Sequence, residues 1–183
     1  MGLLSGWKRC PRCGEPLRGD ETAMSCDACG SRYYAHSAPA VAAIVVDDDG
    51  RILLARRALE PDAGKWDTPG GFLDEGEDPK NAIRRELCEE AGLEVEPGEF
   101  LGAFVDTYGE GPDAGSVLNL VWEARVLSGE MAPADDVSEL RWFAPDELPA
   151  GDDEYAFRWV APFVKSWAAG EGRASSRPRR AGF

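Results

Sequence analysis

The amino-acid sequence predicts an α/β (α+β) domain preceded by a small cysteine-rich module. Three observations lead to this prediction: apolar, β-branched runs bounded by turn residues, one segment with helix start and stop signals, and two close cysteine pairs near the N-terminus. With 183 residues, 43% of them hydrophobic, the chain can bury one core and carry a small appendage. We therefore expect a module over residues 1–35, a main domain over residues 36–169 and a disordered basic tail over residues 170–183.

The charge balance limits the class of partner. Asp and Glu outnumber Lys and Arg by 34 to 20, and the formal net charge is −14, so broad binding to nucleic acid is not expected. An acidic protein can still bind a phosphate compound if divalent cations bridge its carboxylates to the phosphates. Since the sequence has no membrane-spanning apolar run and no signal-peptide pattern at its start, we expect a cytoplasmic protein without membrane contact.

The N-terminal cysteines have the spacing of a structural zinc site. They form two CxxC pairs, and each pair is followed by a glycine that suits a tight turn around a metal-bound sulfur. The first 35 residues lack an apolar periodicity that could build a core, so we predict a zinc ribbon holding structural Zn²⁺. A redox dithiol is the alternative, although it would not require the second pair. The predicted ligands are Cys10, Cys13, Cys26 and Cys29.

The main domain is expected to begin with a β-hairpin. Ala38 to Val46 is an apolar, β-branched run, residues 47–50 are turn formers, and residues 51–55 make a second apolar run. Pro79 to Ala91 is predicted to be a helix, because a proline stands in its first turn and Gly92 directly follows its end.

Further strands are predicted at residues 101–105, 116–126 and 140–143. A C-terminal helical segment over residues 155–169 is expected to pack against the core, with Pro162 either kinking it or starting its regular part. Its packing residues are Phe157, Val160, Phe163, Val164 and Trp167.

Three glutamates share one face of the predicted central helix. Glu89 and Glu90 lie three and four positions after Glu86, so the three side chains fall within an arc of about 100°. Like charges at this spacing destabilise an isolated helix, so a countercharge is expected, and a divalent cation supplies it. An adjoining apolar stripe is available for burial and consists of Ile83, Leu87 and Ala91.

The turn before this helix offers a further metal ligand. Residues 68–71 end in two adjacent glycines, which permit a close approach of the backbone to a ligand, and the carbonyl of Gly70 can complete a metal shell. Hard oxygen ligands favour Mg²⁺, or Mn²⁺ as a substitute.

From Gly71 to Leu93 the sequence resembles the Nudix box, G-x5-E-x7-R-E-U-x-E-E-x-G-U with U apolar, at all nine specified positions. The resemblance extends in strand order over residues 36–169 and implies an αβα sandwich around a mixed β-sheet. It also implies attack of water on a phosphorus atom, which releases a nucleoside monophosphate and a phosphorylated remainder. A pyrophosphohydrolase acting on a nucleoside diphosphate linked to another group is therefore expected.

The resemblance also implies roles for individual residues. Arg85 orients the metal ligands, and Glu77 pairs with Arg85 or joins the metal network. Glu86 is the first choice for the general base, and Glu139, before the last predicted strand, is the second. Cys88, at an unspecified position of the box, is expected to be a packed thiol rather than a nucleophile. The metal ligands carried over from the family are Glu86, Glu89 and Glu90.

The substrate stays open at this stage. A zinc ribbon followed by residues 32–34 and a strand leading into a Nudix domain is similar to the arrangement in NADH pyrophosphatases. Those enzymes carry an SQPWPFPxS stretch after the box, whereas residues 102–110 read GAFVDTYGE, which puts NADH specificity in doubt. Similar ribbon-bearing proteins resemble FAD or ADP-ribose pyrophosphatases, and nucleic acid is expected only as a capped-RNA substrate.

Several aromatic residues are candidates for contact with a base. Trp66, Phe104 and Tyr108 can stack on one, although packing explains each of them equally well. Trp122 and Trp142 lie in predicted strands and are expected in the core.

A nucleotide-sensing regulatory protein, or a module that binds nucleic acid or protein through its ribbon, is the alternative function. Such proteins usually have a degraded box, whereas the three glutamates are intact here. Many relatives pair through their N-terminal parts, so the resemblance is also compatible with a homodimer. The ribbon's basic residues are Lys8, Arg9, Arg12, Arg18 and Arg32.

Overall fold

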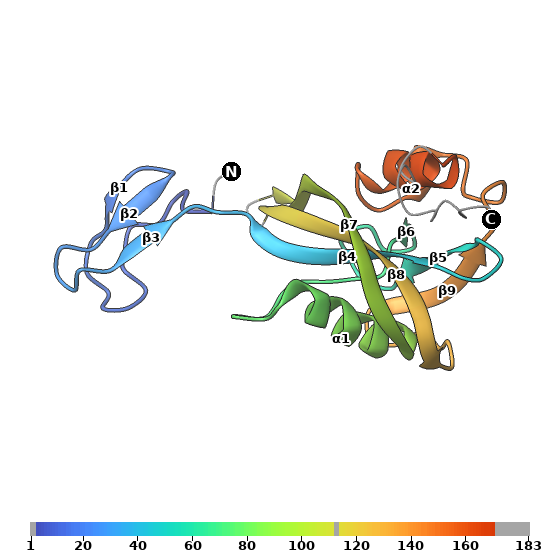
Figure 1. The fold of residues 1–183 in the computed structure, drawn as a ribbon. Helices are drawn as coiled ribbons and strands as arrows, with labels where there is room; N and C mark the ends of the chain where they lie inside the picture. Colours follow the sequence, from blue (N-terminus) through green and yellow to red (C-terminus); the bar gives the residue numbers. More distant parts are fainter. Residues whose placement is uncertain (1–2, 112–113, 171–183) are drawn as a thin grey trace, which may run out of the picture.

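The computed structural model describes residues 3–111 and 114–170. A small N-terminal module leads through a short link into a larger body built around a β-sheet (Figure 1). The predicted tail lies outside the described residues from residue 171 onward. No helix in the described part of the chain is long and apolar enough to cross a bilayer.

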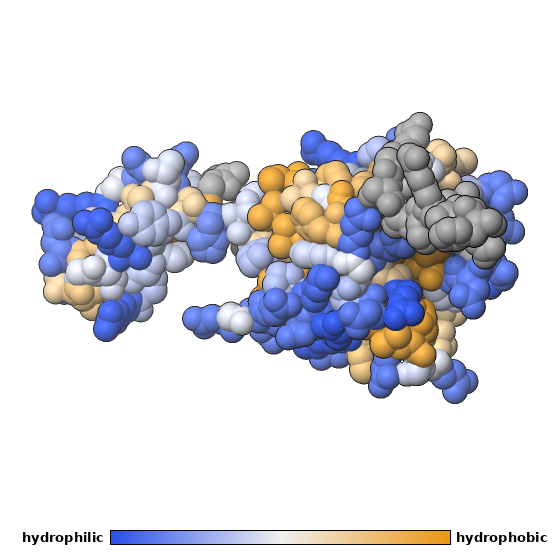
Figure 2. Space-filling model, viewed as in Figure 1, coloured by the Kyte–Doolittle hydropathy of each residue, from blue (hydrophilic) through white to orange (hydrophobic). Residues whose placement is uncertain are grey.

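The module is a three-stranded antiparallel sheet of short strands, and it stands apart at one end of the molecule (Figure 1). Its surface is largely hydrophilic (Figure 2), and its buried apolar residues, among those described, are Leu4, Cys10 and Cys26. So small a core cannot offset the entropy of ordering the module. The strands are β1 (Arg18–Gly19), β2 (Ala23–Ser25) and β3 (Arg32–Tyr34).

The body contains a six-stranded mixed sheet. Strand β4 runs parallel to β8, and β7 pairs with β8 in antiparallel fashion; on the other side, β5 pairs with both β6 and β9 in antiparallel fashion. The strands are β4 (Ala38–Val46), β5 (Ile52–Arg57), β6 (Trp66–Asp67), β7 (Leu93–Tyr108), β8 (Gly115–Gly129) and β9 (Val137–Phe143).

The hairpin predicted at the start of the domain is limited to its turn. The Asp47 side chain accepts hydrogen bonds from the backbone N–H groups of Asp49 and Arg51, which fixes that turn. The two strands pair with each other only between Val46 and Ile52. Beyond that point β4 pairs with β8, and β5 pairs with β9. Distant partners therefore replace the local pairing that the sequence suggests.

One helix covers each face of the sheet, α1 (Pro79–Ala91) below and α2 (Val160–Ala168) above in Figure 1. Residues of β4 alternate between the two cores, as the period of a strand requires. Val41 and Val45 pack with α1, and Ile44 packs with α2. The predicted αβα sandwich is thus confirmed.

Helix α1 has the predicted bounds. Asp78 caps its start by accepting from the N–H of Lys80, and Gly92 ends it at φ 68°, a left-handed conformation that favours glycine. The stripe of Ile83, Leu87 and Ala91 is fully buried. Cys88, however, is exposed, so the prediction of a packed thiol is wrong; one position after Leu87, its side chain points about 100° away from the core.

The other predicted elements are present but longer or shorter than expected. The strand predicted at residues 101–105 lies within β7, which starts directly after Gly92 and has its buried residues at its beginning, at Leu93, Val95 and Pro97. In α2, Pro162 stands in the first turn and therefore starts the regular helix rather than kinking it. Trp122 and Trp142 are only partly buried and pack at the edge of the α1 core.

Candidate active site

The acidic face of α1 lies mostly beneath the surface. Glu86 and Glu90 are 8% and 6% exposed, whereas the side chain of Glu89 is 52% exposed. The helix holds all three on one side because they are three and four residues apart. Two of the three carboxylates are therefore buried without an equal number of buried cations, an arrangement that requires a compensating charge.

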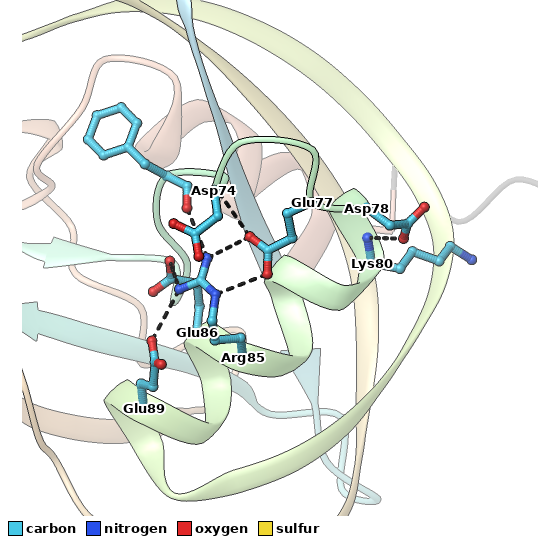
Figure 3. Close-up of polar contacts among 8 residues, drawn as sticks. Asp74, Glu77, Asp78, Lys80, Arg85, Glu86 and Glu89 are labelled. Atoms are coloured by element: carbon cyan, nitrogen blue, oxygen red, sulfur yellow. Dashed lines mark hydrogen bonds and ion pairs between the residues drawn. The ribbon is translucent and has the colours of Figure 1, made fainter.

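Arg85 supplies part of that charge. Its Nε and Nη2 donate to the two oxygens of Glu77 at 3.0 and 2.8 Å, a bidentate pair, and Nη2 also donates to the Phe72 carbonyl (Figure 3). Its Nη1 donates to Glu86 at 2.8 Å and to Glu89 at 3.1 Å. The guanidinium lowers the pKa of Glu77 to about 2 and so keeps that carboxylate ionised. The structure thus brings the predicted Glu77, Arg85 and acidic face together.

The glycine turn packs directly against these acids. The Gly70 N–H donates to Glu90 at 3.0 Å. The carbonyls of Pro69 and Gly71 accept from β4, so the intervening Gly70 peptide faces α1. At Gly71 a Cβ would lie 2.5 Å from a Glu86 oxygen, and at Gly70, where φ is 147°, it would collide with the Val41 carbonyl. Gly70 therefore leaves no room for a side chain, whereas a side chain at Gly71 would require the Glu86 carboxylate to move.

Burial and the charges of neighbouring acids raise the pKa of both Glu86 and Glu90. Desolvation raises the pKa of Glu90 to about 9, with further increases from the charges of Asp136 and Glu86. Desolvation also raises the pKa of Glu86, against the lowering effect of Arg85. Carboxylates that resist ionisation in the free protein and share one face of a helix fit a site for a hard divalent cation, which would restore their charge.

Two acids near this site carry no recognisable signal in the sequence. Asp67, in β6, and Asp136, just before β9, both contribute to the raised pKa of Glu90. They come from segments that only the folded sheet brings beside α1. Glu139, the second candidate for the base, pairs with Arg56 at 3.2 Å, and no described contact links it to the glutamates of α1.

The four cysteines of the module converge as the spacing predicts. Their sulfur atoms all lie within 4.8 Å of one another. A hydrogen bond with Tyr33 lowers the pKa of Cys10 to about 6. Although the Glu15 backbone counteracts it, desolvation together with the Cys26 thiol raises the pKa of Cys13 to about 12. Four thiolates cannot coexist at this distance without a cation, so the cluster fits tetrahedral Zn²⁺.

The comparison with known families agrees with this geometry. The NUDIX domain model matches residues 36–163, which include the whole sheet, the glycine turn and α1. The chain belongs to the Nudix family. The resemblance inferred from the box between Gly71 and Leu93 is thereby confirmed.

Similar proteins span several branches of the Nudix family. An NAD-capped RNA hydrolase NudC of Stutzerimonas stutzeri is 30% identical over 150 residues, which cover 80% of this chain and 51% of that protein. An ADP-ribose pyrophosphatase of Methanocaldococcus jannaschii is 36% identical over 121 residues, 64% of this chain and 68% of that protein. The crystal structure of a NUDIX hydrolase from Nitrosomonas europaea has a TM-score of 0.75 and 26% identity, covering 92% of this chain and 94% of that chain. The chain spans about half the length of the NudC relative.

The aromatic candidates occupy different places in the Nudix domain. Trp66 packs edge-on against Phe143 in the core beneath α2. Phe104 stacks flat on Trp159, with ring centres 5.1 Å apart. Tyr108 borders a cavity that also reaches the glycine turn. Of the three, Tyr108 is therefore the one placed beside the candidate site.

Proposed function

We propose that this protein is a Mg²⁺-dependent Nudix pyrophosphohydrolase. It cleaves the phosphoanhydride of a nucleoside diphosphate joined to another group and releases a nucleoside monophosphate and a phosphorylated product. The observation that carries the proposal is the pair of buried carboxylates, Glu86 and Glu90, packed against a glycine turn in which Gly70 leaves no room for a side chain. Burial of two carboxylates lowers the stability of the fold, and a role in binding a metal would explain their presence.

The acids of α1 hold the metal in this proposal. The ligands are Glu86, Glu89, Glu90 and the carbonyl of Gly70. When bound, Mg²⁺ neutralises the phosphate charge and makes water more acidic. Arg85 is a positioning residue, because it holds Glu86 and Glu89 at once and is itself fixed by the bidentate pair with Glu77. Manganese satisfies the same hard oxygen ligands.

A base must take a proton from the attacking water. Glu86 is our first choice, since it is buried within the acidic face and Arg85 fixes one of its oxygens. Glu139 is the second choice, but its pair with Arg56 would have to open. Asp136 is better placed than Glu139, because its charge acts on Glu86 and Glu90.

The relatives support the substrate class. Their names refer to NAD-capped RNA and to ADP-ribose, and both compounds contain an adenosine diphosphate joined to a further group. We propose this class for the present chain, without a choice between the two. The thiol cluster is proposed to hold one structural Zn²⁺ per chain.

A hydrolysis assay with Mg²⁺ tests the proposal. The panel contains NADH, NAD, FAD, ADP-ribose, NAD-capped RNA and nucleoside triphosphates, with release of monophosphate as the readout. Glu90→Gln should lower kcat at least tenfold, because it removes a metal ligand while preserving the shape of the side chain. Glu99→Gln is the matched control, since Glu99 is exposed on β7, and it should retain full activity. If Glu90→Gln keeps more than about a tenth of kcat, Glu90 is not a metal ligand.

A further inference from the structure

The two CxxC pairs of the module share one backbone conformation. In each pair the N–H of the first cysteine donates to the carbonyl five residues later, at 2.8 and 2.9 Å, and the N–H of the glycine after the second cysteine donates to the carbonyl of the first at 2.8 Å. The two glycines have similar φ angles, 78° and 73°. The equivalent positions are Cys10 and Cys26, Cys13 and Cys29, Gly14 and Gly30, and Glu15 and Ser31. The two halves of the cluster can therefore be compared residue by residue.

The side chains around the two halves differ. The Sγ of Cys29 lies 3.2 Å from the Ser31 hydroxyl, and the Sγ of Cys10 lies 3.2 Å from the hydroxyl of Tyr33, whose ring packs edge-on against Trp7. Cysteine binds zinc as the thiolate, which has no proton to donate, so the two hydroxyls are the donors in the zinc-loaded module. A hydrogen bond to a thiolate withdraws negative charge from the sulfur and fixes its direction. The sulfur is then a weaker nucleophile and a better oriented metal ligand.

Cys13 lacks this contact. The position equivalent to Ser31 is occupied by Glu15, whose ionised carboxylate can only accept hydrogen bonds. Within residues 3–35, no hydrogen bond joins the sulfur of Cys13 or Cys26 to a hydroxyl group. Cys26 is 1% exposed, whereas Cys13 is exposed. Cys13 is thus the ligand in this module that combines exposure with the lack of a donor side chain.

We propose that the zinc site has one point of attack, Cys13, because the hydroxyls of Ser31 and Tyr33 lower the reactivity of Cys29 and Cys10. When the Cys13 sulfur attacks a carbon electrophile, an S–C bond forms and the leaving group departs with the bonding electrons. The product is a neutral thioether, which no longer binds zinc as a thiolate does, so the metal is released. Ser31 and Tyr33 are positioning residues that act through the sulfur atoms. The inference rests on the proposed structural Zn²⁺.

Alkylation of the zinc-loaded full chain tests the proposal. The starting protein is Cys88→Ser, which lacks the exposed thiol outside the cluster. Iodoacetamide is added in limiting amount, mass spectrometry of peptides gives the rate at each cysteine, and a chelating dye follows zinc release. Cys13 should react about three- to tenfold faster than the other three ligands, and zinc should leave at the rate of that reaction. Alkylation of any other ligand ahead of Cys13 overturns the proposal.

Exchange of the hydroxyls tests their part directly. Ser31→Ala should raise the alkylation rate of Cys29 about three- to tenfold, and Ser31→Thr, which keeps a hydroxyl, should not. Tyr33→Phe keeps the ring and should raise the Kd of zinc about tenfold, measured by competition with a chelator. Tyr34→Phe is the matched control, since Tyr34 is the next residue of β3 and is 59% exposed, and it should leave this Kd unchanged.

The reciprocal variant adds the missing donor. Glu15→Ser places a hydroxyl at the position equivalent to Ser31, and Glu15→Ala removes the carboxylate without adding one. Glu15→Ser should therefore slow the alkylation of Cys13 about three- to tenfold relative to Glu15→Ala. Equal rates at Cys13 in these two variants, or an unchanged rate at Cys29 in Ser31→Ala, would contradict the proposal.

Metal analysis separates this inference from the proposed zinc site. If the purified chain contains one zinc but its cysteines are alkylated in another order, the zinc site stands and the point of attack falls. If the chain contains no zinc and does not bind added Co²⁺, both fall. The proposed hydrolysis takes part in none of these measurements, so it stands or falls separately.

Discussion

The cysteine cluster and the acidic face of α1 both gather groups of like charge, yet the rest of the fold treats them differently. Around the thiols the described module buries little apart from Leu4 and two of the cysteines themselves. Around Glu86 and Glu90 two apolar cores, one under each helix, already stabilise the domain. We therefore expect that the first region needs a metal for folding and that the second needs one only for the proposed chemistry.

Loss of the zinc site should have the largest effect on folding. If the module stayed folded without zinc, the contrast between the two regions would be wrong. Cys26→Ser removes a buried ligand, and zinc binding in small modules is worth roughly 10 kcal/mol, so residues 3–35 should unfold. Limited proteolysis should then cut within the module and leave residues 36–170 intact, and metal analysis should show no zinc. Cys88→Ser, outside the cluster, is the control and should change neither result.

Magnesium-free buffer is the counterpart in the second region. It should abolish hydrolysis and leave the Tm of the main domain nearly unchanged.

The contradicting outcome for the cysteine module is a module that resists protease after Cys26→Ser. That result would show that apolar burial, and not metal, stabilises the module.

A core substitution tests whether apolar burial stabilises the main domain independently of the cysteine module. Leu87 is fully buried one position before Cys88, and Leu87→Ala should lower the free energy of unfolding by about 2 to 5 kcal/mol. Cys88→Ala on the exposed face should change it by about 0.5 kcal/mol or less. Urea unfolding of the domain measures both. Zinc content should be the same in both variants, and a loss of zinc in Leu87→Ala would mean that the two regions fold together.

The last and smallest prediction concerns the pH dependence of stability. It depends on Asp67, a mostly buried acid in the main domain. Desolvation, only partly offset by Arg57, raises its pKa from 3.8 to about 7. The folded protein thus binds a proton more tightly than the unfolded chain, so stability should fall as pH rises from about 4 to about 7. The total is at most about 4 kcal/mol, since one pKa unit is worth about 1.4 kcal/mol.

Asp67→Asn should flatten this pH dependence. The difference in unfolding free energy between the variant and the unsubstituted protein, measured without added divalent cation, isolates Asp67 from the other acids. A difference that stays constant between pH 4 and pH 7 would mean that Asp67 ionises normally in the folded protein.

Local signals in the sequence predict local structure well. Pro79 and Gly92 mark both ends of α1, and the spacing of Glu86, Glu89 and Glu90 predicts their common face, because three-residue spacing determines direction on a helix. The CxxC pairs likewise predict the convergence of four sulfurs. Each of these conclusions depends on residues that are near one another in the chain.

Contacts between distant segments could not be read in the same way. The turn after Val46 suggests a hairpin, but nothing in its residues reveals that β4 prefers β8. Asp136 sits in a run of acids that resembles an ordinary solvated loop until the sheet brings it beside Glu90. Nothing in the sequence singles out Trp159, and the lack of a hydrogen-bond partner for its indole Nε1 becomes visible only in the folded structure.

The parallel pairing of β4 with β8 also sets an order of events during synthesis. Ala38 pairs with Val117, so the centre of the sheet cannot close until the ribosome has released most of the chain. The cysteine ligands, in contrast, are all present once Cys29 emerges. Local contacts form faster than distant ones. We therefore expect the cysteine module to fold before β8 is available, while β4 is still unpaired and exposed.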